Sequence, residues 1–399
     1  MTGSIRIGVA GLGRAFTLML PTFVADARVR LVAGADPLPA ARAQFTRDFG
    51  GAAFEDVEAL CEHPDVDVIY IATPHQHHAR HAAVAFAHGK HVLLEKPMAV
   101  TLDDCTAMIE AAQRARRHLI VGHSHSFDRP IARARELIER GDFGRVRMVT
   151  ALNFTDFLYR PRRPEELATE VGGGVIFSQG AHQIDMVRLL GGGRLASVRA
   201  ATGAWDPARP TEGAYSALLA FEDGAFAHAT YSGYAHYDSD ELMGGIGEMG
   251  QKKSPSDYGG ARRRLDAARD AASEATLKAA RNYGGANYAP PGDAPPRAWN
   301  HFGFIVVCCD RADLRPTALG VEIFADRERS FEALPPPRVP RVEVIDELHA
   351  AVSEGKPPVH DGQWARATLE ASIAILASAR ERRDVALKLQ VARGSRDGR

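Results

Sequence analysis

From residue 4 to about 125 the chain alternates short apolar runs with helical patterns, and this alternation strongly constrains the fold. The apolar runs predict strands at Ile5–Ala10, Val29–Ala35, Val68–Ala72, Val92–Leu94 and Leu119–Gly122. Helical patterns lie at about 15–25, 38–49, 56–62, 77–88 and 102–116. Strands that alternate with helices form a parallel sheet covered on both faces, and nearly all-apolar runs fit strands buried on two sides. We therefore predict a doubly wound α/β domain over residues 1–127.

The first predicted strand ends at a short glycine motif, Gly11-x-Gly13. Glycines there let the backbone approach a pyrophosphate, which the N–H groups of the following helix can bind. Phe16 replaces the third glycine of G-x-G-x-x-G, so helix and strand must pack differently. Asp36 ends the second strand, where a carboxylate accepts ribose hydroxyls and repels a 2′-phosphate. These residues favour a Rossmann-type site for NAD over one for NADP. The alternative is that Asp36 is only a turn residue, and nearby Arg42 leaves the choice of cofactor open.

Lys96 precedes a proline at the carboxyl end of a predicted sheet strand. Sheets of this type bind ligands in the crevice at that end. An ammonium group there can hydrogen-bond a substrate hydroxyl and stabilise charge on its oxygen. The alternative is a solvated surface lysine.

Three motifs in this order resemble the Gfo/Idh/MocA oxidoreductases: Gly11-x-Gly13, Thr73-Pro74-x-x-x-His78 and Gly89-Lys90-His91-Val92-x-x-Glu95-Lys96-Pro97. The resemblance implies a catalytic role for Lys96. It also implies a set of cofactor-binding residues: Gly11, Gly13, Arg14, Asp36, Thr73, Pro74, His78 and Glu95. Members of the family carry a C-terminal α/β domain whose open, mainly antiparallel sheet often forms the oligomer interface, so we expect a homo-oligomer.

Residues 128–399 are expected to form this second domain. A predicted helix at about 130–140 precedes strands at 145–154, 195–204, 214–221 and 225–234, and later strands at 303–309 and 320–332. Consecutive strands without intervening helices suit an antiparallel sheet. Helical patterns at 341–353 and 362–381 follow. Residues 236–300, with an Ala/Arg-rich helical pattern at about 257–282 and a proline-rich linker, are interpreted as an inserted arm, either a lid or an interface.

A glycine run opens a helical pattern that carries His182, with Asp185 one turn later. A neutral imidazole suits general-base chemistry, although a lone helical histidine is more often structural. The segment resembles the family motif G-G-G…D-x-G-x-H-x-x-D, which implies an acid/base role for His182. Ser178 stands where many members have aspartate, so either the base works without that carboxylate or the chemistry differs from that of the sugar dehydrogenases. Ser178 and Asp185 are included among the predicted substrate-binding residues.

Arg160, Arg162 and Arg163 lie just ahead of the glycine run. Guanidinium groups bind carboxylates bidentately, so this loop predicts an anionic substrate, with a solvated basic loop as the alternative. Together with the insertion and the stretch around His182, the loop resembles the 4,5-dihydroxyphthalate dehydrogenase branch. That branch oxidises a cis-dihydrodiol of phthalate to the catechol.

Ten of the sixteen histidines lie between residues 63 and 125. We expect His123 and His125 to contact substrate or nicotinamide. No metal is predicted, because no cysteine or carboxylate was found at ligand spacing beside these histidines.

The charged residues, 49 Lys and Arg against 50 Asp and Glu, argue against a dedicated nucleic-acid binder. Four cysteines suit a reducing compartment. The chain shows no run of 18 apolar residues and no signal-peptide pattern, so we expect a cytoplasmic protein without membrane partners.

These features predict an NAD-dependent dehydrogenase for a secondary alcohol, with a cis-dihydrodiol of an aromatic carboxylate as the favoured substrate. The alternatives are a dehydrogenase of sugars, cyclitols or glycosides, and a catalytically silent NAD-binding regulator. The departures at Phe16 and Ser178 motivate the latter, whereas retention of Lys96 and His182 argues against it.

Overall fold

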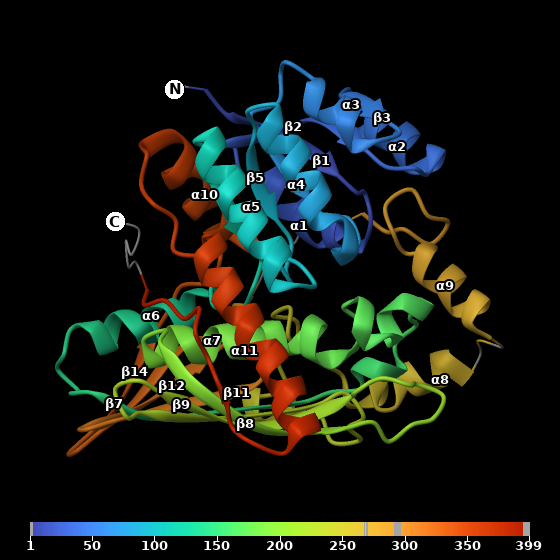
Figure 1. Ribbon diagram of the computed structural model, residues 1–399. Helices are drawn as coiled ribbons and strands as arrows, with labels where there is room; N and C mark the ends of the chain where they lie inside the picture. The colour runs from blue at the N-terminus through green and yellow to red at the C-terminus, as the bar shows by residue number, and fades with distance from the viewer. Residues whose placement is uncertain (1–2, 267, 269, 291–296, 394–399) are drawn as a thin grey trace. The chain divides into compact units, whose positions relative to one another are not determined.

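The computed structural model describes residues 3–266, 268, 270–290 and 297–393 (Figure 1). The chain divides into two compact units. Unit 1 comprises Met1–His123, Ala272–Pro295 and Val339–Arg366. Unit 2 comprises Ser124–Ala271, Pro296–Arg338 and Ala367–Arg399.

Unit 1 contains a six-stranded parallel sheet in the order β3-β2-β1-β4-β5-β6. Its strands are β1 (Ile5–Ala10), β2 (Val29–Ala35), β3 (Ala52–Phe54), β4 (Val68–Ile71), β5 (His91–Leu94) and β6 (Leu119–Val121). The order reverses between β1 and β4, where doubly wound sheets bind their ligands at the carboxyl ends of the strands. The predicted Rossmann-type fold is thus confirmed; only the short β3 was not expected.

The helices of unit 1 follow the predicted pattern closely. They are α1 (Arg14–Ala25), α2 (Pro39–Phe49), α3 (Val57–Glu62), α4 (His78–Ala87) and α5 (Leu102–Ala115), with a 3-10 turn at His75–His77. Thr101 caps α5, because its hydroxyl oxygen accepts a 3.1 Å hydrogen bond from the backbone N–H of Asp104.

Unit 1 also includes chain from beyond residue 128. Helix α10 (Val342–Glu354) packs in this unit, where Asp346 forms a 2.7 Å ion pair with Arg28. The hydroxyl of Thr22 donates to the carbonyl oxygen of Pro340. A segment that follows the second sheet in sequence therefore completes the first unit.

Unit 2 contains a nine-stranded sheet in the order β14-β13-β12-β11-β7-β10-β9-β8-β15. Its strands are β7 (Val146–Phe154), β8 (Leu195–Gly203), β9 (Ala214–Phe221), β10 (Phe226–Ser232), β11 (Phe304–Cys309), β12 (Ala312–Thr317), β13 (Gly320–Ala325), β14 (Arg329–Ala333) and β15 (Val385–Ala386). Only β7 and β10 pair in parallel, so the predicted mainly antiparallel sheet is confirmed. A hairpin at Gly224 joins β9 to β10, whereas β12 and β15 were not predicted.

One face of this sheet is covered by helices, and Figure 1 shows α7 lying along it. The helices of unit 2 are α6 (Arg129–Glu139), α7 (Ala181–Gly191) and α8 (Gly260–Asp266), and α11 (Gly362–Glu381) lies mostly in this unit. Short 3-10 turns occur at Phe157–Tyr159, Pro164–Leu167, Thr169–Val171, Ser239–Met243 and Pro255–Asp257, and a π-helix at Ile176–Gly180. Burial alternates along β9 and β10, which leaves Leu218 and Phe226 exposed.

The predicted arm at 236–300 is divided between the two units. The helical pattern expected over 257–282 forms two helices, α8 in unit 2 and α9 (Ala271–Ala279), which lies in unit 1 from Ala272 onward. The linker expected around Pro290–Pro296 and the chain end fall mainly outside the described residues. None of the helices in the described part of the chain has the length and apolarity that a membrane crossing requires.

Candidate active site

The loop after β1 is shaped for close approach of an anion. Gly11 has a φ of +91°, and a Cβ there would lie 2.9 Å from the carbonyl oxygen of Ala72. Gly13 is the N-cap of α1, and no side chain caps that helix end. A Cβ on Gly13 would meet only the Nδ2 of Asn282, at 4.0 Å. The helix N-terminus can therefore bind a phosphate through its backbone N–H groups.

Asp36 is held at the end of β2 by two backbone groups. Its Oδ2 accepts from the N–H of Leu12 at 2.8 Å, and its Oδ1 accepts from the N–H of Leu38 at 2.9 Å. Each carboxylate oxygen has further acceptor capacity, so the fixed group can also bind ribose hydroxyls. Arg42 donates to the carbonyl oxygens of Asp36 and Pro37 at 2.7 and 2.9 Å. Arg42 thus stabilises the turn at Asp36 and Pro37 through these two hydrogen bonds.

Several residues predicted to bind the cofactor link the ends of β4 and β5. The ring nitrogens of the fully buried His78 lie 2.9 Å from the carbonyl oxygen of Thr73 and 3.0 Å from that of Pro97. Burial lowers the pKa of His78 to about 4, so the ring is neutral near pH 7. Glu95 accepts a 2.7 Å hydrogen bond from the Tyr70 hydroxyl, and burial raises its pKa. Direct cofactor contacts for His78 and Glu95 remain predictions.

The other predicted cofactor and catalytic residues of unit 1 lie at element ends. Arg14 begins α1, and Lys96 follows the end of β5 as a half-buried residue. Thr73 follows β4, and its hydroxyl lies 3.0 Å from Nδ1 of His81. Pro74 caps the 3-10 turn that precedes α4. Lys96 thus lies at the sheet edge where its predicted role requires it.

In unit 2, His182 lies at the start of α7, directly after the π-helix. The His182 ring is buried, with its centroid 4.8 Å from that of His125 and 5.1 Å from that of Phe302. The Ser178 hydroxyl donates to the carbonyl oxygen of Gly174, inside the irregular turn. Because π-bulges often occur at functional sites, this geometry is consistent with a catalytic His182.

His125 is a buried cation between two carboxylates. Its Nδ1 lies 2.6 Å from Oδ2 of Asp128, and its Nε2 lies 3.4 Å from Oε1 of Glu248. Burial alone would lower the pKa of His125, but the two carboxylates raise it to about 9. Burial likewise opposes ionisation of Glu248, yet His125 holds the pKa of that carboxyl well below its usual range. His125 therefore carries a proton on both nitrogens near pH 7.

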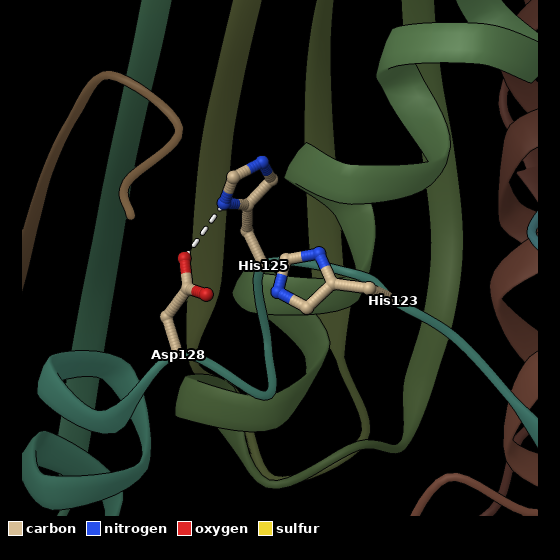
Figure 2. Close-up of side chains that lie close together, drawn as sticks. All are labelled: His123, His125 and Asp128. Atoms are coloured by element: carbon tan, nitrogen blue, oxygen red, sulfur yellow. Dashed lines mark hydrogen bonds and ion pairs between the residues drawn. The ribbon is translucent and has the colours of Figure 1, made fainter. Parts of the chain in front are cut away.

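Figure 2 shows His123, His125 and Asp128 close together, with the hydrogen bond between His125 and Asp128 drawn as a dashed line. Each of the three residues offers one metal-ligating atom, and these atoms lie within 4.8 Å of one another. The expectation that no carboxylate stands at ligand spacing beside the histidines was therefore wrong, because Asp128 follows His125 by three residues. A metal bound through His125 would have to displace one of the two protons that Asp128 and Glu248 hold on its ring.

Asp185 anchors α7 in unit 2. Its Oδ1 accepts from the Thr368 hydroxyl at 2.7 Å, and its Oδ2 accepts from the hydroxyls of Ser124 and Ser126. These bonds hold α7 against the segment that carries His125. Asp185 is thus observed as a positioning residue, and the substrate contact expected of it remains a prediction.

The three arginines of the predicted anion-binding loop differ in their surroundings. Arg163 pairs with Glu165 at 3.1 Å, and Arg160 pairs with Asp156 at 3.2 Å. The guanidinium carbon of Arg162 lies 3.5 Å from the centroid of the Phe157 ring. Burial lowers the pKa of Arg162 to about 10. At Arg162 the effect of burial on the pKa thus outweighs that of the nearby carboxylate, whereas at Arg160 the carboxylates of Glu248 and Asp156 outweigh burial.

Glu248 and Phe302 were missed as contributors to this site. Glu248 follows His125 by 123 residues and lies in the 236–300 arm, so no local spacing connects the two. Asp128 is different, because its spacing of three from His125 is visible in the sequence.

A doubly wound sheet with a glycine loop, in a chain whose second unit holds a buried histidine site, is typical of a dinucleotide-dependent oxidoreductase. Two family models match the chain. One, described as the oxidoreductase family with an NAD-binding Rossmann fold, matches residues 5–123, and the GFO/IDH/MocA C-terminal domain matches residues 131–251.

Individual relatives agree with the family models. The 1-carboxy-3-chloro-3,4-dihydroxycyclohexa-1,5-diene dehydrogenase of Comamonas testosteroni is 53% identical over 93% of this chain and 94% of its own length. A dTDP-3,4-didehydro-2,6-dideoxy-alpha-D-glucose 3-reductase of Saccharopolyspora spinosa is 32% identical over 62% of this chain and 75% of its own. A Bordetella bronchiseptica RB50 protein of known crystal structure is 40% identical, with a TM-score of 0.90 over 96% of this chain and 100% of its own.

The chain belongs to the Gfo/Idh/MocA oxidoreductase family. The resemblance seen in the motifs is confirmed, as are NAD as the cofactor and a dehydrogenase as the class of enzyme.

Proposed function

We propose that this enzyme oxidises a cis-dihydrodiol of a cyclohexadiene carboxylate to the corresponding catechol, with NAD as oxidant. The observation that carries the substrate choice is the 53% identity, over nearly the whole chain, to a dehydrogenase of a carboxylated dihydroxycyclohexadiene. The guanidinium group of Arg162, which lies over the Phe157 ring, gives this choice a physical basis within unit 2.

The reaction removes one hydride and one proton from a secondary alcohol. NAD, when bound, would accept the hydride from the carbon that carries the hydroxyl. His182 accepts the proton from the hydroxyl oxygen, and Lys96 stabilises the negative charge that develops on that oxygen. The ketone that forms loses a ring proton to its own oxygen on tautomerisation, and the aromatic catechol makes the oxidation favourable.

His125 has a positioning role in this mechanism. Asp128 and Glu248 fix its ring, and the ring contacts His182 edge to face. Asp185 fixes the helix that carries His182. The orientation of the proposed base therefore depends on the carboxylates of Asp128, Glu248 and Asp185.

We propose that Arg162 binds the carboxylate of the substrate, assisted by Arg160. A guanidinium group can bind a carboxylate through two parallel hydrogen bonds, which fixes the orientation of an anionic ligand. Burial lowers the pKa of Arg162, and an anionic ligand there would favour its charged form. Arg163, already paired with Glu165, is expected to contribute less.

The test compares a carboxylated cis-dihydrodiol with the same ring lacking the carboxylate, by following NADH absorbance. Replacing Arg162 with Met should raise KM for the carboxylated diol by roughly tenfold or more and change KM for the uncharged diol little. Arg147→Met is the matched control, since Arg147 is exposed at the other end of β7 and pairs with Asp310. Equal KM changes for both diols would contradict the role of Arg162.

A sugar or cyclitol substrate is the second candidate, favoured by the 32% identity to a sugar-nucleotide reductase. The same absorbance assay distinguishes the two classes. Turnover of sugars without turnover of the carboxylated diol would overturn the proposed function.

We also propose that the enzyme forms a homo-oligomer through the open sheet of unit 2. Its outer face exposes four large apolar side chains, of Leu218, Phe226, Phe324 and Phe331. Such a surface is more typical of an interface than of a monomer. Sedimentation equilibrium that gives a monomer at micromolar concentration would contradict this proposal. The four free cysteines support the expected cytoplasmic location, which fractionation of the host cell would test.

A further inference from the structure

The part of the arm that belongs to unit 1 reaches the glycine loop. Asn282, three residues after the end of α9, places its Nδ2 4.0 Å from the position that a Cβ on Gly13 would take. Gly13 is the residue at which the backbone lies open at the N-terminus of α1. A side chain from the insertion thus lies beside the loop that the family motif assigns to the cofactor.

A set of specific contacts anchors this part of the arm. The Tyr283 side chain is 2% exposed, and its hydroxyl donates to Oδ2 of Asp48 at 2.6 Å. Its ring lies edge-on to the ring of Phe16, with a centroid distance of 5.2 Å. Gly284 has a φ of +77°, and a Cβ there would lie 2.7 Å from Cα of Ala41. The backbone beside Asn282 is therefore closely packed on α1 and α2.

These contacts explain the departure from G-x-G-x-x-G at Phe16. A glycine at that position normally permits close packing between helix and strand. Here the fully buried Phe16 ring is instead part of the surface on which Tyr283 packs. The substitution therefore builds a docking site for the arm next to the glycine loop.

The amide of Asn282 has capacity for a ligand. Its Oδ1 is buried, and the described residues give it no hydrogen-bond partner. A buried amide oxygen without a partner is costly, and a ligand hydroxyl would remove that cost. The amide nitrogen of the same group can donate to an anion.

We propose that residues 282–284 form a second wall of the dinucleotide site, in which Asn282 donates from Nδ2 to the pyrophosphate and accepts at Oδ1 a hydroxyl of the ribose on the far side of the pyrophosphate from adenine. The inference rests on NAD binding at the glycine loop and extends it to a residue outside the family motif. The insertion thereby takes part in cofactor binding.

The experiment measures binding of ADP-ribose and of adenosine to the full-length chain by isothermal titration calorimetry. Asn282→Ala should weaken ADP-ribose binding roughly tenfold, because a hydrogen bond to a charged group is lost. Adenosine lacks both the pyrophosphate and the ribose beyond it, so Asn282→Ala should bind it within about twofold of the wild-type affinity. Asn287→Ala is the matched control, because Asn287 is exposed on the same segment.

Asn282→Asp keeps the shape of the side chain and adds a negative charge beside the pyrophosphate. It should weaken ADP-ribose binding by about a hundredfold relative to the wild type, which is more than Asn282→Ala does. The variant also tests the contact if Asn282→Ala fails to fold.

The possible results distinguish a failure of the Asn282 contact from a failure of the cofactor site on which it rests. A wild-type chain that does not bind ADP-ribose would contradict the cofactor site itself. If the wild type binds and both Asn282 variants bind ADP-ribose as tightly, the second wall is wrong. An equal loss of adenosine affinity in Asn282→Ala would also overturn the proposed contact, since it would show a general change of the site.

Discussion

The two units hold their functional groups by different means. The glycine loop of unit 1 offers open backbone at Gly13, and Asp36 is held there by backbone N–H groups. The site of unit 2 consists instead of buried side chains, with a charged His125 between two carboxylates beside His182. Backbone recognition suits a cofactor that a whole family shares, whereas side chains from loops and insertions can change with the substrate.

The largest effect is expected on removal of the proposed base in unit 2 or the proposed cation in unit 1, which should lower turnover without weakening cofactor binding. His182→Ala and Lys96→Ala should each lower kcat by about 10²–10⁴-fold, the usual contribution of a positioned acid or base. The Kd for NADH, measured by its fluorescence, should change less than about twofold, because neither side chain is needed to hold the cofactor on the glycine loop. Activity that survives in either variant would contradict the role given to that residue.

The cofactor preference should depend on one carboxylate of unit 1. Asp36→Asn keeps the acceptor geometry at the end of β2 but removes the charge that repels a 2′-phosphate. The ratio of kcat/KM for NAD over NADP should fall by roughly tenfold or more, since one charge-assisted interaction is worth about 1.5–3 kcal/mol. Asp103→Asn, an exposed change of equal charge on α5, is the control. An unchanged ratio would mean that other groups select the cofactor.

The charge on His125 should set the alkaline limit of activity. Because its folded pKa of about 9 lies above the ordinary value of 6.5, the charge is complete below pH 6.5 and is lost as the pH rises through 9. His125 is faced by Asp128, Glu248, His182 and Phe302, with Arg160 and His301 acting on Glu248.

Glu248→Gln removes one of the two charges that raise this pKa. The alkaline limb of the kcat/KM profile should move to lower pH by about one unit, with a change of less than about threefold at pH 7. Asp128→Asn should move the limb further, because Asp128 lies closer to the ring. A limb that stays in place in both variants would show that the charge of His125 does not matter to turnover.

Much of unit 1 could be predicted because its signals are local. Each strand from Ile5–Ala10 onward is an apolar run of its own, and Thr101 marks the start of α5 by its spacing from Asp104. The three-residue strand β3 was missed because it is half-buried and too short to show a pattern. In unit 2, β12 escaped notice because its Pro316 is unusual in a strand.

The contacts within the sites were less predictable. Glu248 approaches His125, and Asn282 approaches Gly13, across sequence separations that no periodicity bridges. The π-helix before His182 was also missed, since an extra residue in a helical turn leaves no pattern in the sequence. Asp128 could have been found, because a carboxylate three residues after a histidine is visible in the chain.

The return of α10 to unit 1 has a consequence for how the protein is made. During synthesis residues 1–123 leave the ribosome before the rest of unit 1. The ion pair of Arg28 with Asp346 and the hydrogen bond of Thr22 to the carbonyl of Pro340 can form only after more than 300 further residues have emerged. Until then the nascent Rossmann sheet lacks a part of its own packing. The cofactor-binding unit is therefore completed only after most of the second sheet has been synthesised, so removing residues 339–366 should damage the unit that residues 1–123 begin.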